Sequence, residues 1–280
     1  MMTNLSRPPA AGLVSSPPAA GLVSRRRLIG FGGAAAGGLL LSACDGLAHA
    51  DKLTKVVKSA EIATERWQRL VGRNGLAQEF TAADLSPVFK VNGTHEPMEP
   101  EYQAHKAENF VNWKLAIGGL VNNPMALSLA QLRSMPARTQ ITRHDCVEGW
   151  SAIGQWTGPQ LGLLLKAANM KTNARYVVLR CADNYGGELS KGGTQSTSLY
   201  YESIDLVDAL HPQTILAHAM NGAPLTVGHG APVRLRVERQ LGYKQAKYIM
   251  GIDVVASLDG YGSGKGGYWE DRGYEWYAGI

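Results

Sequence analysis

The chain has 280 residues, of which 45% are hydrophobic and 18% charged, with 33 glycines and three cysteines. This length and apolar fraction allow a substantial core, and they exclude a disordered, collagen-like or disulfide-framework protein. The formal net charge is +5, but residues 1–50 hold four arginines and one acid, which leaves 24 cations and 22 anions elsewhere. A nearly neutral body argues against nucleic-acid binding, which needs clustered basic groups.

Residues 1–50 have the pattern of an export segment. The first 24 residues are mostly Pro, Ala, Gly and Ser, and repeat PPAAGLVS at 8–15 and 17–24, a composition that predicts disorder. Three arginines, 25–27, then precede a Gly/Ala/Leu run that ends at Leu41, as in a signal peptide. The run is shorter than the ~20 apolar residues of a membrane span. Ser-Arg-Arg-x-Leu-Ile resembles a twin-arginine signal, which implies periplasmic localisation of a protein exported already folded.

Two processing sites compete at the end of this segment. Leu41-Ser42-Ala43-Cys44 resembles a bacterial lipobox, in which the cysteine is lipidated and becomes a membrane anchor. Ala48-His49-Ala50 is a site of the A-x-A type for ordinary cleavage before Asp51. The lipobox accounts for a cysteine directly after the apolar run, and both readings remain open.

Apolar residues then recur at helical spacing, which predicts an amphipathic helix in the segment 51–77, from Asp51 to Val71, with its apolar stripe packed on the main domain. Residues 72–112 show no strong period. Strands are predicted at 113–117, 138–143, 175–181, 214–220, 233–237 and 246–255, and helices at 128–135, 159–168 and 205–210. Strands and helices mix without regular βαβ alternation, so we expect one α+β domain over residues 78–280, with mixed β-sheets and surrounding helices.

Two cysteines, Cys146 and Cys181, remain in this domain. In an oxidising compartment they could form one disulfide, or Cys146 could bind a soft transition metal through its thiolate. Cys146 lies in the polar, partly cationic segment 142–151, whereas structural cysteines usually lie among aliphatic residues. The CxxC and HxxxH pairs of zinc sites are absent from the sequence.

The segment Cys146-Val147-Glu148-Gly149-Trp150-Ser151, followed by Trp156-Thr157-Gly158, resembles the molybdenum-cysteine segment of the sulfite oxidase family. Further collinear matches occur at 113–121, 175–183, 220–224, 230–234 and 242–247. The likeness is greatest to the exported bacterial branch that includes the periplasmic methionine sulfoxide reductase catalytic subunit. It implies a sulfite-oxidase-type fold that binds a molybdenum-molybdopterin cofactor.

The resemblance also implies roles for single residues. Cys146 matches the cysteine whose thiolate binds molybdenum. Tyr274 matches a substrate-pocket tyrosine, and Arg143, directly before the metal-ligand segment, could attract the substrate. The residues that match or could supply cofactor contacts are His105, Asn109, Cys181, His229, Arg234, Gln245, Ala246 and Lys247. For His105 and Asn109 the register of the match is not fixed, and for Cys181 a place in the core is an equal alternative.

The function implied by the resemblance is two-electron oxygen-atom transfer, with sulfoxide-type reduction favoured. Sulfite oxidation and a non-catalytic envelope binding module are the alternatives. The chain lacks a CxxCH haem motif and an iron–sulfur cysteine set, so electrons are expected from a separate cytochrome partner.

Overall fold

The structure is a computed structural model that describes residues 51–184 and 199–280. The twin-arginine segment, Cys44 and both processing sites lie outside the described residues. The chain divides between Ala63 and Thr64 into two compact units, and the second carries the sheets and the candidate site. Within the described residues, every helix is too short or too polar to cross a membrane.

Helix α3 (Asp51–Gly72) runs across the unit boundary. Its part in the second unit does not bury the predicted apolar stripe, because Trp67, Leu70 and Val71 are all exposed. Arg69 instead forms ion pairs with Asp205 and Asp208 at 2.8 Å each. The expectation of stripe packing is therefore wrong for these residues, whose attachment is ionic.

The described residues of the second unit form three sheets. The largest has the strand order β2-β1-β11-β5-β6, and β1 is parallel to β11 while its other pairs are antiparallel. It consists of β2 (Met125–Ser128), β1 (Lys114–Gly119), β11 (Ile249–Val255), β5 (Tyr176–Cys181) and β6 (Tyr201–Asp205). The second sheet has the order β3-β4-β8-β9, and the third pairs β10 with β7. Their strands are β3 (Ala137–Cys146), β4 (Trp150–Pro159), β8 (Ala219–Met220), β9 (Ala223–Pro224), β10 (Arg234–Arg236) and β7 (Ile215–Ala217).

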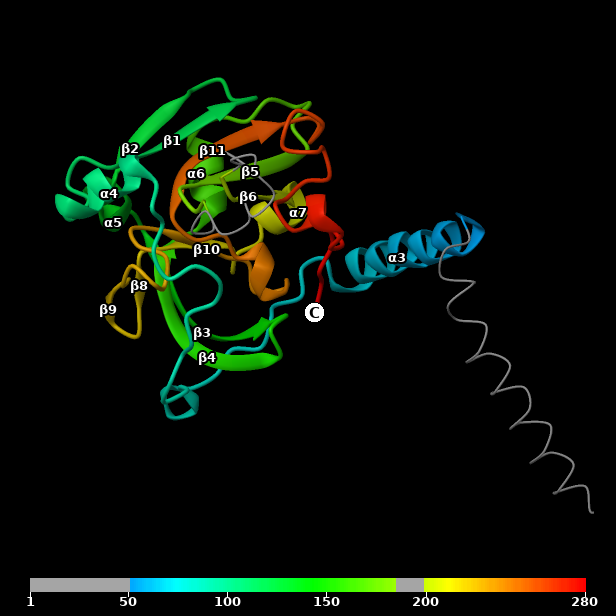
Figure 1. Cartoon of the computed structure of the whole chain (residues 1–280), viewed down its shortest axis with the longest axis horizontal. Helices are drawn as coiled ribbons and strands as arrows, with labels where there is room; N and C mark the ends of the chain where they lie inside the picture. The colour runs from blue at the N-terminus through cyan, green and yellow to red at the C-terminus, as the bar shows by residue number, and fades with distance from the viewer. Residues whose placement is uncertain (1–50, 185–198) are drawn as a thin grey trace, which may run out of the picture. The chain divides into compact units, whose positions relative to one another are not determined.

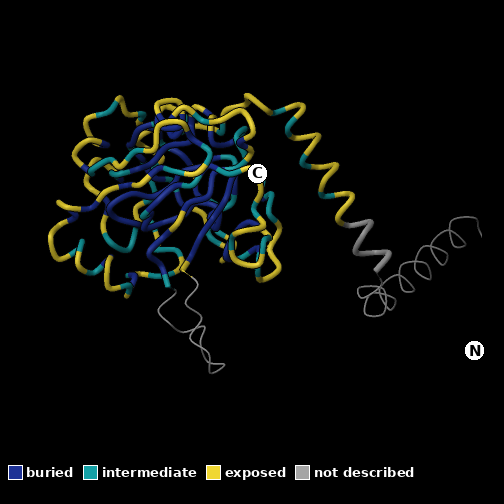
Figure 2. The backbone as a smooth tube through the Cα atoms, turned by 90° about the horizontal axis from the view of Figure 1, so that it is seen from above, coloured by how far each residue is buried: buried dark blue, intermediate teal, exposed yellow. Residues whose placement is uncertain are grey.

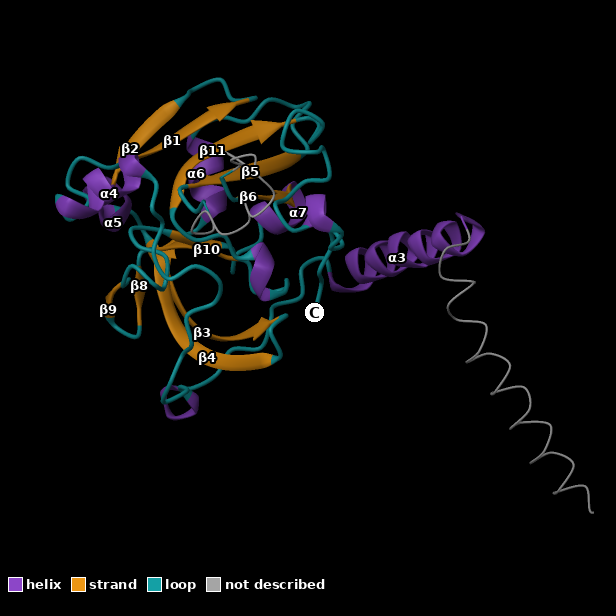
Figure 3. Cartoon of the chain, viewed as in Figure 1, coloured by secondary structure: helices purple, strands orange, loops and turns teal. Residues whose placement is uncertain are grey.

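Short helices connect these strands (Figures 1 and 3). They are η1 (Ala82–Asp84), α4 (Pro100–Ala107), α5 (Leu129–Ser134), α6 (Leu161–Ala167), α7 (Leu206–Ala209), η3 (Gly242–Lys244) and η4 (Glu270–Arg272). Helix α5 begins as predicted at its cap Ser128, whose hydroxyl accepts from the Gln131 N–H at 3.2 Å. The mixture of sheets and helices confirms the α+β class.

The core of this unit lies around the large sheet. Alternate residues of β1, Leu115 and Ile117, are buried, and β5 and β11 contribute Val177, Leu179, Ile252 and Val254. Figure 2 shows the buried backbone running through the middle of the unit, with exposed connections around it. In β11, Ile252 and Val254 share a buried face, whereas Asp253 and Val255 on the other face are half-buried. This difference fixes the register, because a one-residue slip would turn each side chain to the opposite face.

Candidate active site

Strands β3 and β4 form a long hairpin that carries Cys146. The ladder runs from the pair Ala137–Pro159 to the pair Cys146–Trp150, so the cysteine occupies the last paired position of β3. The turn that follows is closed by the Gly149 N–H, which donates to the Cys146 carbonyl at 3.1 Å. Gly149 has φ +83°, which glycine adopts readily and other residues rarely do. The hairpin therefore holds the thiol at a fixed place beside a tight turn.

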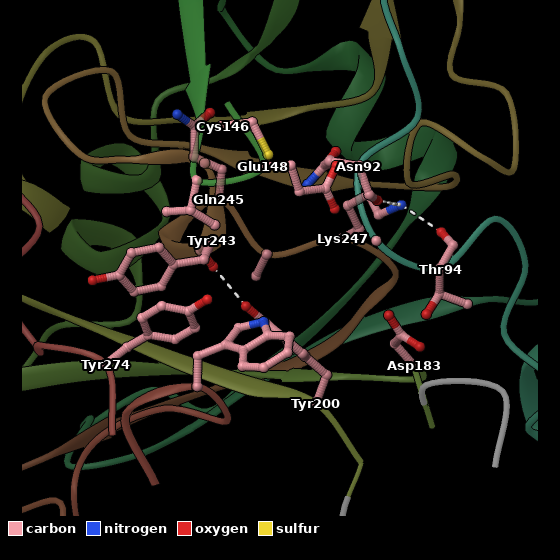
Figure 4. A pocket seen from close by; sticks show the side chains of 15 residues that line it. Asn92, Thr94, Cys146, Glu148, Asp183, Tyr200, Tyr243, Gln245, Lys247 and Tyr274 are labelled. Atoms are coloured by element: carbon pink, nitrogen blue, oxygen red, sulfur yellow. Dashed lines mark hydrogen bonds between the residues drawn. The ribbon is translucent and has the colours of Figure 1, made fainter. Parts of the chain in front are cut away.

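Cys146 opens into a cavity of about 700 Å³, counting the part open to solvent. The cavity wall comes from segments far apart in sequence: Asn92, Gly93, Thr94, Cys146, Val147, Glu148, Asp183, Tyr200, Gly242, Tyr243, Gln245, Ala246, Lys247, Trp269 and Tyr274. Figure 4 shows the sulfur of Cys146 near Glu148, with Tyr243 and Tyr274 on one side and Lys247, Thr94 and Asp183 on another.

Lys247 is a buried cation in this wall. Its Nζ donates to the carbonyls of Asn92, Thr94 and Gly228 at 2.7, 2.6 and 2.9 Å. Burial, followed by the positive charge of Arg234, lowers the pKa of Lys247 to about 7. An anionic ligand in the cavity would favour the charged ammonium.

Arg234 is a second buried cation behind the same wall. Its side chain is fully buried, and it donates to the carbonyls of His229 at 3.1 Å and Gln245 at 3.4 Å. Within the described residues its Nε has no hydrogen-bond partner and the guanidinium has no carboxylate partner. Burial, then the charge of Arg236, lowers the pKa of Arg234 to about 9. An uncompensated buried charge of this kind indicates a site for an anion.

Arg236, two residues along β10, has the opposite arrangement. It is equally buried but is paired with Glu238 at 2.5 Å, and it donates to Nδ1 of His144 at 3.0 Å. Both arginines stack on Trp156, at 4.9 Å for Arg234 and 4.4 Å for Arg236. Within the described residues, Arg234 is therefore the one of these two arginines that lacks a carboxylate partner.

Aromatic side chains form the outer part of the cavity. Tyr243 and Tyr274 stack with ring centroids 5.2 Å apart, and Trp269 meets Tyr274 edge-on at the same separation. The Tyr200 hydroxyl donates to the Tyr243 carbonyl at 2.6 Å, and this bond holds the backbone of Tyr243 in place. Tyr274 is 42% exposed, which places it at the mouth of the cavity.

The Cys146 thiol is free, as is that of Cys181. Burial is the main reason that the pKa of Cys146 is raised, so the thiol is protonated near neutral pH unless a positive charge is added. A bound metal ion supplies that charge and deprotonates a coordinating thiol. Together with the two buried cations, the thiol makes the cavity suitable for a ligand that combines a metal with anionic groups.

The structure brings together five of the predicted site residues, Cys146, Gln245, Ala246, Lys247 and Tyr274, in the wall of one cavity. Arg234 lies directly behind that wall, because it donates to the Gln245 carbonyl.

The other predicted residues lie elsewhere. Arg143 is 57% exposed, pairs with Asp145 at 3.0 Å and lines a different depression with Glu238. His229 lies between Thr226 and Phe89, with its ring nitrogens 2.8 Å from the Thr226 hydroxyl and 3.1 Å from the Phe89 carbonyl. Cys181 is buried in the core.

His105 lies in the last turn of α4, Asn109 lies two residues after that helix ends, and both are outside the cavity wall. His105 faces Glu101 at 3.9 Å, and the Asn109 N–H donates to the Lys106 carbonyl at 3.0 Å. The cofactor contacts of His105, Asn109, Cys181 and His229, and the substrate role of Arg143, stay predictions.

The upstream part of the wall is instead the segment Asn92–Thr94, which sequence reasoning missed. Asn92 presents a buried Oδ1 that has no hydrogen-bond partner within residues 51–184 and 199–280. This segment has no regular structure and no hydrophobic period, but Asn92 and His95 form an Asn/His pair about ten residues before the candidates at 102–110. That composition was the available signal.

Comparison with known proteins identifies the family. Residues 102–259 match the family described as oxidoreductase molybdopterin binding domain. The chain belongs to this family. It is an oxidoreductase, and its cofactor is molybdenum-molybdopterin.

Relatives agree with this assignment. The chain is 36% identical over 228 residues to a putative protein-methionine-sulfoxide reductase subunit, YedZ1, of Azospira oryzae, a match that covers 80% of this chain and 77% of the relative. It is 33% identical over 189 residues to the protein-methionine-sulfoxide reductase catalytic subunit MsrP of Xanthomonas axonopodis pv. citri, covering 65% of this chain and 57% of that protein. Among solved structures, the sulfane dehydrogenase SoxCD of Paracoccus pantotrophus is similar with a TM-score of 0.46 and 21% identity, over 52% of this chain and 39% of that one.

The predicted resemblance to molybdopterin-dependent oxidoreductases is thus confirmed, and the alternative of a non-catalytic module is not retained. The described residues also fit the cofactor. Cys146 offers a thiol for the metal, while Arg234 and Lys247 are buried cations that lack carboxylate partners within the described chain, as an anionic pterin phosphate requires.

Proposed function

We propose that this chain is an exported catalytic subunit that reduces sulfoxides, with protein-bound methionine sulfoxide as the substrate class. The sulfoxide takes up two electrons and two protons and gives a thioether and one water. The observation that carries the proposal is the meeting of the Cys146 thiol, the buried cations and an aromatic wall in one cavity. The names of the relatives, which are methionine sulfoxide reductase subunits, support the substrate class.

In this proposal residues of the wall and Arg234 behind it would hold the cofactor. Cys146 would bind molybdenum through its thiolate, and Arg234 would bind the phosphate. Lys247, whose three N–H groups donate to carbonyls, would contribute its positive charge, and Gln245 and Ala246 would provide the adjoining backbone. When bound, the cofactor supplies two-electron oxygen-atom transfer. The carbonyls of Asn92, Thr94 and Gly228 fix the Lys247 ammonium in place, so that its charge is oriented before the ligand binds.

The outer cavity favours a neutral sulfur compound over sulfite. Tyr243, Tyr274 and Trp269 offer aromatic surfaces, and contacts between sulfur and aromatic rings contribute roughly 0.3–1.5 kcal/mol each. Glu148 and Asp183 also line the cavity. These carboxylates repel a sulfite anion, whereas a neutral sulfoxide meets no such penalty. Sulfite oxidation is therefore the less favoured alternative.

The electron donor in this proposal is a separate cytochrome in the membrane or periplasm. The relatives are named as subunits, which agrees with a reaction shared between chains. The export pattern of residues 1–50 supports a periplasmic location reached by the twin-arginine route. Lipidation at Cys44 would anchor the enzyme near a membrane donor, and cleavage after Ala50 would release it.

The test uses protein exported natively and loaded with molybdenum. We expect reduction of methionine sulfoxide with a reduced dye as electron source, and slower oxidation of sulfite with an oxidised dye. Cys146→Ala should abolish activity and the molybdenum–thiolate absorption band. Thr139→Ala, an exposed change near the other end of the same hairpin, is the control that retains both. Faster sulfite oxidation than sulfoxide reduction would contradict the substrate class, and an active Cys146→Ala variant would contradict the role of the thiol.

A further inference from the structure

Three charged side chains meet in the core behind the cavity. Lys244 Nζ lies 2.5 Å from Glu202 Oε1 and 2.5 Å from Glu270 Oε1. The side chains are 1%, 0% and 1% exposed for Lys244, Glu202 and Glu270. They come from η3, β6 and η4, and we refer to them as the Glu–Lys–Glu cluster.

The cluster is joined to the cavity through one short turn. Residues 242–247 supply Gly242, Tyr243, Gln245, Ala246 and Lys247 to the wall. Lys244 is the member of this run that does not line the cavity, and its ammonium contacts the core, with the Trp276 ring 5.3 Å away. The residues on either side of Lys244 therefore face the cavity while its own charge is fixed from behind.

The cluster has an unbalanced charge. Two carboxylates face one ammonium, and both Oε2 atoms, of Glu202 and Glu270, lack hydrogen-bond partners in the described chain. Burial is the main reason that the pKa of Glu202 is raised well above its usual value, which favours the uncharged form of this carboxyl. Such buried ionic groups are often no more stable than well-packed apolar ones, and fixing one conformation is a role that can explain their presence.

Backbone contacts of the same turn show what is being fixed. The Lys244 and Gln245 N–H groups donate to Leu241 at 3.0 Å and to Gly242 at 3.1 Å. The Gln245 carbonyl accepts from Arg234. A shift of Lys244 would displace Tyr243 and Gln245, and with them the partner of Arg234.

We propose that Lys244 is a positioning residue, which the two glutamates hold in the core so that residues 242–247 keep the shape that binds the cofactor. The proposal rests on the assignment of this cavity to the molybdopterin cofactor. It assigns no contact between Lys244 and the cofactor or the substrate.

The test replaces the cluster by apolar side chains of similar size in natively exported protein: Lys244→Met with Glu202→Met and Glu270→Met. Neutral replacement of a buried ionic cluster leaves stability nearly unchanged or raises it, so the thermal midpoint should stay close to that of the wild type. Molybdenum and pterin per chain should fall, and the affinity for the cofactor should drop about 10–100-fold, as for other residues that orient a metal site. The molybdenum–thiolate absorption band of the loaded fraction should also shift.

The double variant Arg180→Met with Asp253→Asn is the matched control. It removes one ion pair of 2.9 Å between β5 and β11, and neither residue lines the cavity. Cofactor content and absorption should match the wild type. If the triple variant also shows wild-type cofactor content and absorption, the proposal is overturned, because the cluster is then purely structural.

If the triple variant does not fold, Lys244→Arg decides the question. It keeps the positive charge but places a larger planar group in the same closed space, which must move the turn. A shifted absorption band and a raised KM support the proposal, and a wild-type band with a wild-type KM overturns it. A wrong cofactor assignment would give a different result: the wild-type protein itself would contain no molybdenum.

Discussion

Arg234 offers the sharpest test of the site, because its removal should act in opposite directions with and without the cofactor. Its guanidinium is buried and lacks a carboxylate partner within residues 51–184 and 199–280. In Arg234→Met the charge is gone and a side chain of similar length remains. The chain without cofactor should become more stable, while the chain with cofactor should lose it.

The magnitude follows from the electrostatics of the site. The pKa of Arg234 falls from 12.5 to about 9, chiefly because of burial, which corresponds to about 5 kcal/mol of unfavourable free energy for the charged form. Methionine forfeits the hydrogen bonds to the His229 and Gln245 carbonyls, which together are worth roughly 3 kcal/mol. The net gain in unfolding free energy without cofactor is therefore about 1–3 kcal/mol, or a rise in thermal midpoint of about 2–4 °C per kcal/mol for this size of domain.

The assay compares urea unfolding of protein prepared without cofactor with the molybdenum content of protein exported natively. Arg236→Met is the matched control on the same strand and the same Trp156 ring. It leaves Glu238 buried without its charged partner, with the Gln140 amide as its remaining side-chain donor, so it should destabilise both forms by about 3–5 kcal/mol. Equal destabilisation by the two variants, together with full cofactor content in Arg234→Met, would refute the assignment of Arg234 to an anionic ligand.

Two further predictions concern residues around this site and the base of α3. Asp208 accepts from Arg69, Arg239 and Gln240; burial alone would raise its pKa, but these partners outweigh it and hold the pKa below the usual value. Asp208→Asn should lower the unfolding free energy by about 3–5 kcal/mol at pH 7. The lowered pKa stabilises the fold at pH values above the unfolded pKa of about 4, and this stability is lost as the pH falls through the folded pKa. In urea titrations at several pH values, the unfolding free energy of the variant should therefore fall less steeply with acid than that of the wild type. An equally steep fall would exclude Asp208 as its source. Gly230 has φ +105°, and an added Cβ would lie 3.1 Å from the Cβ atoms of Arg234 and Lys247, so Gly230→Ala should cost about 1–3 kcal/mol and reduce molybdenum content. Gly222→Ala, with φ +78° and open space around it, should cost stability without changing molybdenum content. Equal cofactor loss in both variants would contradict a role for the packing of Gly230 against Arg234 and Lys247 in cofactor binding.

The hydrophobic pattern of the sequence predicts an element correctly where the buried residues are apolar and the exposed ones polar. Strand β5, helix α6 and the Ser128 cap of α5 lie within or close to the predicted segments. Strand β4 was missed because its buried face is made of small residues, Ala152, Gly154 and Gly158, around Trp156. A Cβ on Gly158 would meet the Leu216 carbonyl at 2.0 Å, so close packing removed the hydrophobic signal there.

Other elements were not predicted because their burial does not follow the hydrophobic pattern. Strand β6 was missed because Glu202 and Ser203, two of its five residues, are polar and fully buried, so the strand lacks an alternating pattern. Helix α4 was missed because only Tyr102 of its eight residues is buried. The stripe on α3 shows the converse, since Trp67 and Leu70 have helical spacing but remain exposed.

The site was predictable where it follows a local motif. The run that begins at Cys146 and the run 242–247 both carried the family resemblance, and both line the cavity. Asn92 and Thr94 could not be placed from sequence. They lie at the site because their carbonyls accept from the Lys247 ammonium, and a contact over such a sequence separation leaves no local pattern. The absence of a carboxylate beside Arg234 within the described chain is likewise a three-dimensional property.

The distribution of the cavity wall along the chain has a consequence for biogenesis. The wall begins at Asn92 and ends at Tyr274, and contacts of such high sequence separation form late in folding. A nascent chain that ends before Trp269 therefore cannot complete the pocket, and cofactor insertion must follow translation of the residues up to Tyr274. Retention of the cofactor then reports that the segments from Asn92 to Tyr274 have come together in the folded chain.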